Sequence, residues 1–350
     1  MTINHIAIIK LDAIGDYILI RNFLHAIKNT STFPNSKITL VGTNSINELV
    51  QEFDKDVIHE FINIDKQKFF ASKGYRRSIK STIQDKRFDL ALNPCFSRTW
   101  LSDIIIHQMI SPKKIGWRGD CLNINPIKKW IGNWFYTELL SDSNFTFEFE
   151  RNRDFFQRAL NADFSSTSCR WGIAKDSSKY AIISLGSSSP FRRWSTKKYA
   201  QLARLINESL RLNIILVGGQ DCLGEEKKFE NEFHGEYQNL IGKTSLPELI
   251  SLAGNSAIAV SNDSSFAHIC VATETPVIVI SNGNHLNRFV PYPKELSSNY
   301  KAIFPPEMNK MLPHELSQLS QNSTLNIETI EVEDVWSECK RLYEGSEKNL

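Results

Sequence analysis

Residues 5–28 have the sequence HIAIIKLDAIGDYILIRNFLHAIK, which begins with an apolar run and passes through a glycine turn. The run at 5–10 predicts a buried strand, and the apolar spacing at 17–28 predicts a helix. Strand, glycine turn and helix in this order open a doubly wound α/β domain, which binds ligands at the carboxyl ends of its strands. The first candidate site is therefore the turn that contains Gly15 and Asp16.

The alternation of strand and helix continues and then restarts in the second half of the chain. The first set has strands at 37–41, 57–64 and 89–93 and helices at 75–86 and 151–161. The second set has strands at 180–185, 213–217, 257–260 and 276–280 and helices at 196–210, 223–233, 246–253 and 265–272. Two such sets predict two Rossmann-like domains with a ligand in the cleft between them.

The segments between and after the two sets complete the predicted organisation. Residues 112–143 are predicted to be rich in loops, because Gly116, Gly119, Pro126 and Gly132 interrupt the pattern. The polar run 165–168 is the predicted linker, which gives domains at 1–168 and 169–327. Residues 328–350 contain an amphipathic helix that we expect to pack back on the N-terminal domain.

Composition narrows the classes of function. The net charge of +2 argues against a protein whose whole surface binds nucleic acid. The six cysteines lack metal-ligand spacing, so reduced thiols in a cytoplasmic protein are expected. No stretch approaches the roughly 18 uninterrupted apolar residues of a membrane span, and Lys10, Asp12 and Asp16 interrupt the apolar N-terminus before a signal sequence forms.

Asp16 has two interpretations. At the start of a helix its carboxylate is suited to capping, which is the common role of Asp at this position. At the mouth of the first strand it is also suited to contacting a ligand. The sequence around Asp16 leaves both open.

Two motifs in the second half predict a site for a nucleotide diphosphate. The turn GSSSPFRRW, residues 186–194, offers hydroxyls from Ser187 and Ser188 and positive charge from Arg192 and Arg193. The run SNDSSFAH, residues 261–268, opens a helix at which Asp263 or Ser264 is suited to capping and His268 to hydrogen bonding. Each follows a strand-like run and opens a helix, so backbone N–H groups would point at phosphate.

Three further segments have a structural and a functional interpretation. Gly219 either ends a strand or lets the backbone approach a ribose, and Lys243, Thr244 and Ser245 form either a loop with a helix cap or a wall beside the base. The loop SNGNHLNRFVPYP, residues 281–293, carries more planar hydrogen-bonding side chains than a connector needs. Its candidate sugar-binding residues are Asn284, His285 and Arg288, and the alternative is a loop that stabilises itself.

A local excess of positive charge lies between residues 65 and 87. A solvated helix face is the ordinary interpretation, and a site for an anionic acceptor or a membrane surface is the alternative. The candidate acceptor-binding residues are Lys73, Arg76, Arg77 and Lys80.

Taken together and in order, five segments resemble glycosyltransferase family 9, the bacterial heptosyltransferases. They are KLDAIGDYILI, GSSSPFRRWSTKKYAQLARLI, LVGGQD, NLIGKTSLPEL and SNDSSFAHICVATETPVIVI. The resemblance covers nearly the whole chain and implies a GT-B fold and inverting, metal-independent transfer, often from ADP-heptose in lipopolysaccharide assembly. Two features depart from the family pattern: Ser265 replaces a common glycine, and SNGNHLNRF replaces a Gly-Pro-Thr loop.

By position, the resemblance makes Asp16 the general base. The residues that it assigns to the donor are Ser187, Ser188, Arg192, Lys243, Thr244, Ser245, Asp263, Ser264, Ser265 and His268. Arg193 and Gly219 lie beside these positions and are also expected to bind the donor. The partners it implies are a nucleotide-sugar donor and a glycan or lipid-linked glycan acceptor, with peripheral contact at the cytoplasmic face of the inner membrane. Neither a cofactor nor a metal ion is expected, because the nucleotide-sugar is a substrate and the transfer that the resemblance implies is metal-independent.

Other classes of protein share parts of this pattern. A nucleotide-dependent oxidoreductase would carry G-x-G-x-x-G after the first strand, and residues 12–16 lack it. A nucleotide-sugar epimerase on the same scaffold remains an alternative, and it would act on the donor without an acceptor. A noncatalytic relative would bind nucleotide without turnover, and Asp16 would then be dispensable.

Overall fold

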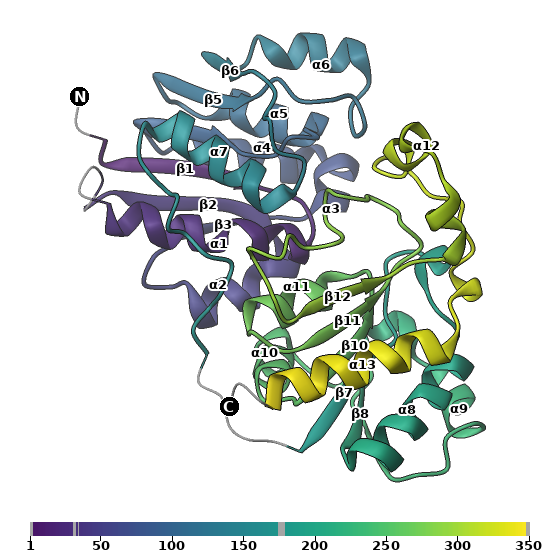
Figure 1. Cartoon of the computed structure of the whole chain (residues 1–350). Coiled ribbons are helices and arrows are strands. Elements are labelled where there is room, and N and C mark those ends of the chain that lie inside the picture. The colour runs from purple at the N-terminus through teal and green to yellow at the C-terminus, as the bar shows by residue number, and fades with distance from the viewer. Residues whose placement is uncertain (1–2, 31–32, 34, 174–178, 348–350) are drawn as a thin grey trace. The chain divides into compact units, whose positions relative to one another are not determined.

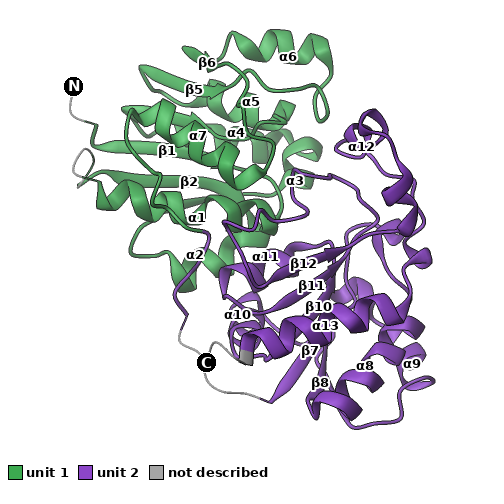
Figure 2. Ribbon diagram, viewed as in Figure 1, with its two compact units in different colours: residues 1–168 green, residues 169–350 purple. Residues whose placement is uncertain are grey.

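The computed structural model describes residues 3–30, 33, 35–173 and 179–347 (Figure 1). The chain divides into two compact units, Met1–Ser168 and Cys169–Leu350, coloured separately in Figure 2. Each unit holds one six-stranded sheet whose strands all pair in parallel. The predicted α/β class with two Rossmann-like halves is therefore confirmed.

The sheet of unit 1 has the order β3-β2-β1-β4-β5-β6, so its direction of winding reverses between β1 and β4. Ligands bind at such a switch point, outside the carboxyl ends of the strands. The Asp16 turn follows β1 directly. The strands are β1 His5–Lys10, β2 Lys37–Thr43, β3 Glu60–Ile64, β4 Leu90–Asn93, β5 Lys113–Trp117 and β6 Glu138–Leu140.

Helices cover both faces of this sheet. On one face, Phe23 of α1 packs against Phe149 and Phe156 of α7 at ring-centroid distances of 4.9 and 5.4 Å. On the other, Phe69 of α3, Ile79 of α4 and Ile105 of α5 enter a shared core with the strands. The helices are α1 Ile14–Asn29, α2 Asn47–Phe53, α3 Lys66–Ala71, α4 Lys73–Gln84, α5 Trp100–Gln108, α6 Pro126–Asn133 and α7 Glu148–Leu160.

The prediction of a loop-rich segment at 112–143 was wrong in part, because this segment forms β5, α6 and β6, while residues 118–125 form no helix or strand. Two of its glycines allow close packing where we expected chain breaks. A Cβ at Gly116 would lie 2.5 Å from the ring of Tyr136, and one at Gly132 would lie 2.2 Å from Asp103 Oδ2. Pro126 occupies the first turn of α6, where proline is tolerated because it has no N–H to satisfy.

The sheet of unit 2 has the order β12-β11-β10-β7-β8-β9, so it reverses between β7 and β10. These two strands pair in register, with Ser184 opposite Ser261. Their carboxyl ends therefore lie side by side. The strands are β7 Tyr180–Ser184, β8 Asn213–Val217, β9 Tyr237–Asn239, β10 Ile258–Asn262, β11 Val277–Ile280 and β12 Tyr300–Ile303.

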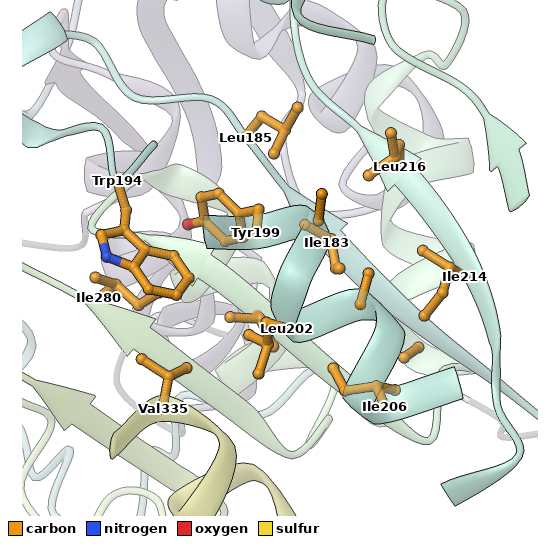
Figure 3. Packing of buried hydrophobic residues seen from close by; sticks show 14 of the residues in the cluster. Ile183, Leu185, Trp194, Tyr199, Leu202, Ile206, Ile214, Leu216, Ile280 and Val335 are labelled. Atoms are coloured by element: carbon orange, nitrogen blue, oxygen red, sulfur yellow. The ribbon is translucent and has the colours of Figure 1, made fainter. Parts of the chain in front are cut away.

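One face of this sheet packs on α8, α9 and α13 around Trp194, Tyr199, Leu216 and Val335 (Figure 3). The helices of unit 2 are α8 Thr196–Leu210, α9 Glu225–Glu230, α10 Leu246–Gly254, α11 Ser265–Ala272, α12 Pro313–Gln318 and α13 Val332–Glu347. α13 contacts α8, β11 and β12. It belongs to the core of unit 2, and residues 348–350 lie outside the described residues. Packing of 328–350 on the N-terminal domain stays a prediction.

Within the described ranges, no helix is both long and apolar enough to cross a membrane. The six cysteines are free, and all but Cys121 are buried.

Candidate active site

The ends of β7 and β10 carry the two predicted diphosphate motifs, and the structure brings these motifs together. Asn262 at the end of β10 joins them: its Nδ2 donates to the carbonyl of Leu185 at 2.9 Å, and its Oδ1 accepts from the N–H of Trp194 at 2.9 Å. The Ser187 hydroxyl donates to the carbonyl of Asp263 at 3.5 Å. Sequence reasoning missed Asn262, although a polar residue closing an apolar strand was a usable signal.

The two arginines of the turn have different surroundings. Arg193 donates to the carbonyl of Ser187 from Nε at 3.1 Å and from Nη2 at 2.8 Å, and it also pairs with Asp221. These contacts hold the turn in shape. Arg192 instead pairs across the two motifs, with its Nη1 3.3 Å from Asp263 Oδ2, and its Nη2 donates to the Ser188 hydroxyl.

Asp263 is almost fully buried at the end of β10. Burial raises the pKa of its carboxyl to about 6, although the charge and hydrogen bond of Arg192 act in the opposite direction. The carboxylate of Asp263 is therefore a poorly solvated partner for Arg192.

Ser264 caps α11, and it is one of the two residues that were predicted for this role. Its hydroxyl accepts from the N–H of Phe266 at 3.3 Å. Ser265, the first residue of the helix, is half-buried. The partial positive charge of the helix N-terminus is thus close to Arg192 and Asp263, as anion binding requires.

His268 lies one turn further into α11 and is buried. Its Nδ1 is 2.6 Å from the hydroxyl of Tyr292, which belongs to the loop 281–293. Burial lowers the pKa of His268 to about 4, so the ring is neutral near pH 7. The structure places His268 between α11 and this loop, and its contact with the donor remains a prediction.

A cavity of about 990 Å³ opens beside the arginine turn. It brings Ser188, Arg192 and Arg193 together with Asn284 and His285 of the loop after β11. Arg288 does not appear among the described residues that line this cavity. The segment 322–328, which no sequence motif marked, forms the remaining wall.

Hydrogen bonds connect the loop 281–293 to that wall. The N–H of Ser323 donates to Asn284 Oδ1 at 3.2 Å, and its hydroxyl donates to the carbonyl of Asn282 at 2.5 Å. Asn287 and Val290 close the distal part of the loop through a backbone hydrogen bond of 2.7 Å. The loop therefore stabilises itself in part, while His285 still faces the cavity.

The remaining predicted donor residues lie near the ends of β8 and β9. A Cβ at Gly219 would lie 2.7 Å from Asp221 Oδ1, at the end of a side chain that is half exposed. Lys243 Nζ donates to the carbonyl of Asn239 at 3.0 Å, and Ser245 caps α10, while Thr244 is half-buried beside it. Their contact with a nucleotide base remains a prediction.

In unit 1, the Asp16 turn contains a buried cation. Lys10 Nζ lies 3.0 Å from Asp12 Oδ2 and 3.8 Å from Asp16 Oδ1. Burial acts to lower the pKa of Lys10, but the two carboxylates hold it above its ordinary value. The Lys10 ammonium is therefore charged at neutral pH.

Asp16 is not the N-cap residue of α1, but its side chain takes part in the capping box of this helix. Ala13 occupies the cap position, and Asp16 lies in the first turn, where its Oδ2 accepts from the N–H of Ala13 at 3.2 Å. Asp12 is the second carboxylate of the turn and accepts from Cys95 Sγ at 3.5 Å. Burial raises the pKa of Asp12, but Lys10 and Cys95 outweigh it and hold this pKa below its usual range.

The four predicted acceptor residues lie on α4, in two kinds of environment. Lys73, Arg77 and Lys80 are exposed. Arg76 is half-buried, and its Nη1 donates to the carbonyls of Phe69 and Phe70 at 2.9 and 3.0 Å. Arg76 thus satisfies the end of α3, which makes it part of the structure of this surface.

Comparison with known proteins gives a family for the chain. Residues 76–310 match the model of glycosyltransferase family 9 (heptosyltransferase). A stretch of 94 residues is 33% identical to lipooligosaccharide heptosyltransferase 2 of Haemophilus influenzae, covering 26% of this chain and 27% of that relative.

Solved structures match over nearly the whole chain. A glycosyltransferase of family 9 from Veillonella parvula has a TM-score of 0.78 at 16% identity, covering 98% of each chain. The E. coli heptosyltransferase WaaC with ADP has a TM-score of 0.75 at 15% identity, covering 97% of this chain and 99% of that one. These similarities confirm the predicted GT-B type of fold.

Proposed function

Because the chain belongs to glycosyltransferase family 9, we propose that this enzyme transfers a heptose from ADP-heptose to a glycan acceptor of lipopolysaccharide or a related surface glycan. Transfer inverts the anomeric carbon and uses protein groups in place of a metal ion. The observation that carries this proposal is the meeting of Arg192, Asp263 and the N-terminus of α11 at the neighbouring ends of β7 and β10.

In this proposal unit 2 binds the donor. A diphosphate replaces Asp263 as the partner of Arg192, which gains a more highly charged acceptor for its hydrogen bonds. The Ser188 hydroxyl and the amides of α11 bind the remaining oxygens. These groups also stabilise the negative charge that develops on the leaving nucleotide diphosphate.

The comparisons support ADP and heptose as the donor's parts. One similar structure holds ADP, and the relative from Haemophilus influenzae is a heptosyltransferase. The cavity beside Arg192 provides the space for a sugar, with Asn284 and His285 supplying hydrogen bonds. Sugar recognition by this cavity is part of the proposal.

Unit 1 supplies the general base in this account. Asp16 accepts the proton of the acceptor hydroxyl as that oxygen attacks the anomeric carbon. Asp12 is a poorer candidate, because its ion pair with Lys10 keeps its pKa low and its basicity weak. Lys10 holds both carboxylates in place from the buried side.

The exposed cations of α4 are assigned to the acceptor. Lys73, Arg77 and Lys80 are suited to a phosphorylated or lipid-linked glycan. A lipid-linked acceptor would bring the enzyme to a membrane surface, so we propose peripheral association with the cytoplasmic face of the inner membrane.

The direct test is release of nucleotide from ADP-, UDP-, GDP- and dTDP-sugars by the purified protein, with and without a glycan acceptor. We expect release from ADP-heptose only when acceptor is present. Conversion of the donor without acceptor would identify an epimerase, and binding without turnover would identify a noncatalytic relative. Preference for another nucleotide would contradict ADP as the nucleotide of the donor.

A further inference from the structure

α6 carries an apolar stripe that faces away from the protein. Ile127, Trp130, Ile131 and Trp134 recur at the spacing i, i+3, i+4, i+7, which in most helices marks the side buried in the core. Here Ile127 is 70% exposed, Trp130 64% and Trp134 77%. α6 connects β5 to the edge strand β6, at the rim of unit 1 (Figure 1).

The opposite side of α6 is fixed to the protein, so the stripe cannot turn inward. Gly132 faces α5, where a Cβ would lie 2.2 Å from Asp103 Oδ2. Asn133 accepts from buried Arg98, and Lys129 donates to the carbonyl of Gly119. The exposure of the stripe is therefore built into the packing of the helix.

One exposed cation, Lys128, lies on α6 beside the stripe, whereas Lys129 is bonded to Gly119 on the opposite side. α6 itself carries no acidic residue, and the nearest acids in the sequence are Asp120 and Glu138. α5 lies next to α6 and to α4. At the end of α5, burial lowers the pKa of His107, and the nearby charges of Lys114 and Lys80 lower it further. Exposed tryptophan and isoleucine beside lysine are typical of helices that lie in the interface of an anionic bilayer.

We propose that α6 docks unit 1 on the surface of a membrane that contains anionic lipid, with Trp130 and Trp134 entering the interface and Lys128 contacting headgroups. This docking rests on the proposed function in one respect, that the acceptor is held in a membrane. It adds a binding surface made of other residues than Asp16, the donor site and the cations of α4.

A second copy of the chain fits this stripe less well. A stable protein interface uses about 20–30 residues on each side, whereas the stripe presents three large side chains on a helix of eight residues and a fourth, Trp134, at its C-cap. A bilayer requires no matching partner surface, and it accepts a short apolar stripe when lysines add electrostatic attraction.

The test is cosedimentation of the full chain with vesicles of phosphatidylcholine alone or with phosphatidylglycerol added. The variant Trp130→Gln/Trp134→Gln should lose about tenfold or more in its partition onto anionic vesicles. The matched control is Leu312→Gln, which removes an exposed apolar side chain of unit 2 (57% exposed) and should bind like wild type. Added salt should weaken wild-type binding in part, because the lysine contribution is screened.

Several results would overturn docking at α6. They are equal binding by wild type and the tryptophan variant, absence of wild-type binding to both vesicles, or an equal loss in Leu312→Gln. Sedimentation velocity without lipid provides another: a wild-type dimer that the tryptophan variant abolishes would assign the stripe to a second copy. Circular dichroism checks the fold, which exposed substitutions should leave unchanged.

Kinetics separate this docking from the proposed function. With a water-soluble, delipidated acceptor, the tryptophan variant should keep the wild-type kcat and KM. With the acceptor in vesicles, its KM should rise. Vesicle binding that depends on the tryptophans without any transfer activity would support docking while contradicting the proposed function.

Discussion

Arg192 and Asp263, 71 positions apart in the chain, form an ion pair with 3.3 Å between Nη1 and Oδ2. The pair joins the turn after β7 to the start of α11. Burial raises the pKa of Asp263 to about 6, so this carboxyl takes up a proton more readily than an ordinary aspartate. The proposed arrival of a diphosphate exchanges this partner for a more strongly charged one.

The first prediction concerns Arg192. Arg192→Ala should weaken binding of ADP by about 1.5–3 kcal/mol, the contribution of a hydrogen bond to a charged group. Isothermal titration calorimetry measures the loss. Arg192→Lys is the matched control, since it keeps the charge and should retain part of the affinity. Unchanged affinity in the alanine variant would remove Arg192 from the donor site.

The second prediction is a pH dependence of stability due to His268. Burial lowers the pKa of His268 to about 4 in the folded protein from 6.5, so between these pH values the unfolded chain binds more protons. Stability should therefore fall as the pH decreases from 6.5 to 4, by up to about 3 kcal/mol. Denaturant unfolding at several pH values should show a smaller decrease for His268→Gln. Parallel curves for the two proteins would show that the buried imidazole is not the cause.

The third prediction concerns the exposed cations of α4. Replacing Lys73, Arg77 and Lys80 by Gln should raise the KM for a phosphorylated or lipid-linked acceptor roughly threefold to tenfold, the scale of a few exposed charge contacts. Donor affinity should not change. Arg76 is left in place because it satisfies the end of α3. If the variant has wild-type acceptor kinetics at low salt, these cations do not bind the acceptor and form an ordinary solvated helix face.

The fourth prediction distinguishes two residues of the loop 281–293. His285 lines the cavity, and we expect His285→Gln to change the ratio of kcat/KM between sugars on one nucleotide roughly fivefold to tenfold, the effect of about one hydrogen bond. Arg288→Gln is the comparison and should change this ratio less. Equal losses for every donor in the His285 variant would indicate collapse of the loop.

Much of the fold could be predicted from the sequence. Apolar periodicity placed β1, β8, α8 and α11 with the bounds that the structure shows. Prediction failed at β5, α6 and β6, because local signals treat glycine as a breaker. At Gly116 and Gly132 a side chain would collide with the ring of Tyr136 and the carboxylate of Asp103. Such contacts between residues 20 or more positions apart cannot be recognised from a local sequence pattern.

The sequence was enough to predict which residues belong to the candidate site, but it did not predict which of them contact each other. Ser264 was recognisable as a cap, since capping is a local interaction. The contact of Arg192 with Asp263 depends on the order of strands in the sheet, and the wall at 322–328 has no motif of its own. The different role of Arg193, which donates to the carbonyl of Ser187, could also be recognised only in the structure.

The last prediction concerns Asp16. Asp16→Asn should lower kcat by about 10²–10⁴, because an amide cannot take the proton of the acceptor hydroxyl. The fold should persist, since Asn can still accept from the N–H of Ala13. Asp12→Asn is the matched control on the other side of Lys10, and it should cost stability more than turnover.

The measurement that tests this account most directly is single-turnover transfer by Asp16→Asn with saturating ADP-heptose, beside a titration of the same variant with ADP. We expect transfer to fall by about 10²–10⁴ while the Kd for ADP stays at the wild-type value. Wild-type transfer by this variant would contradict Asp16 as the base of an inverting glycosyl transfer.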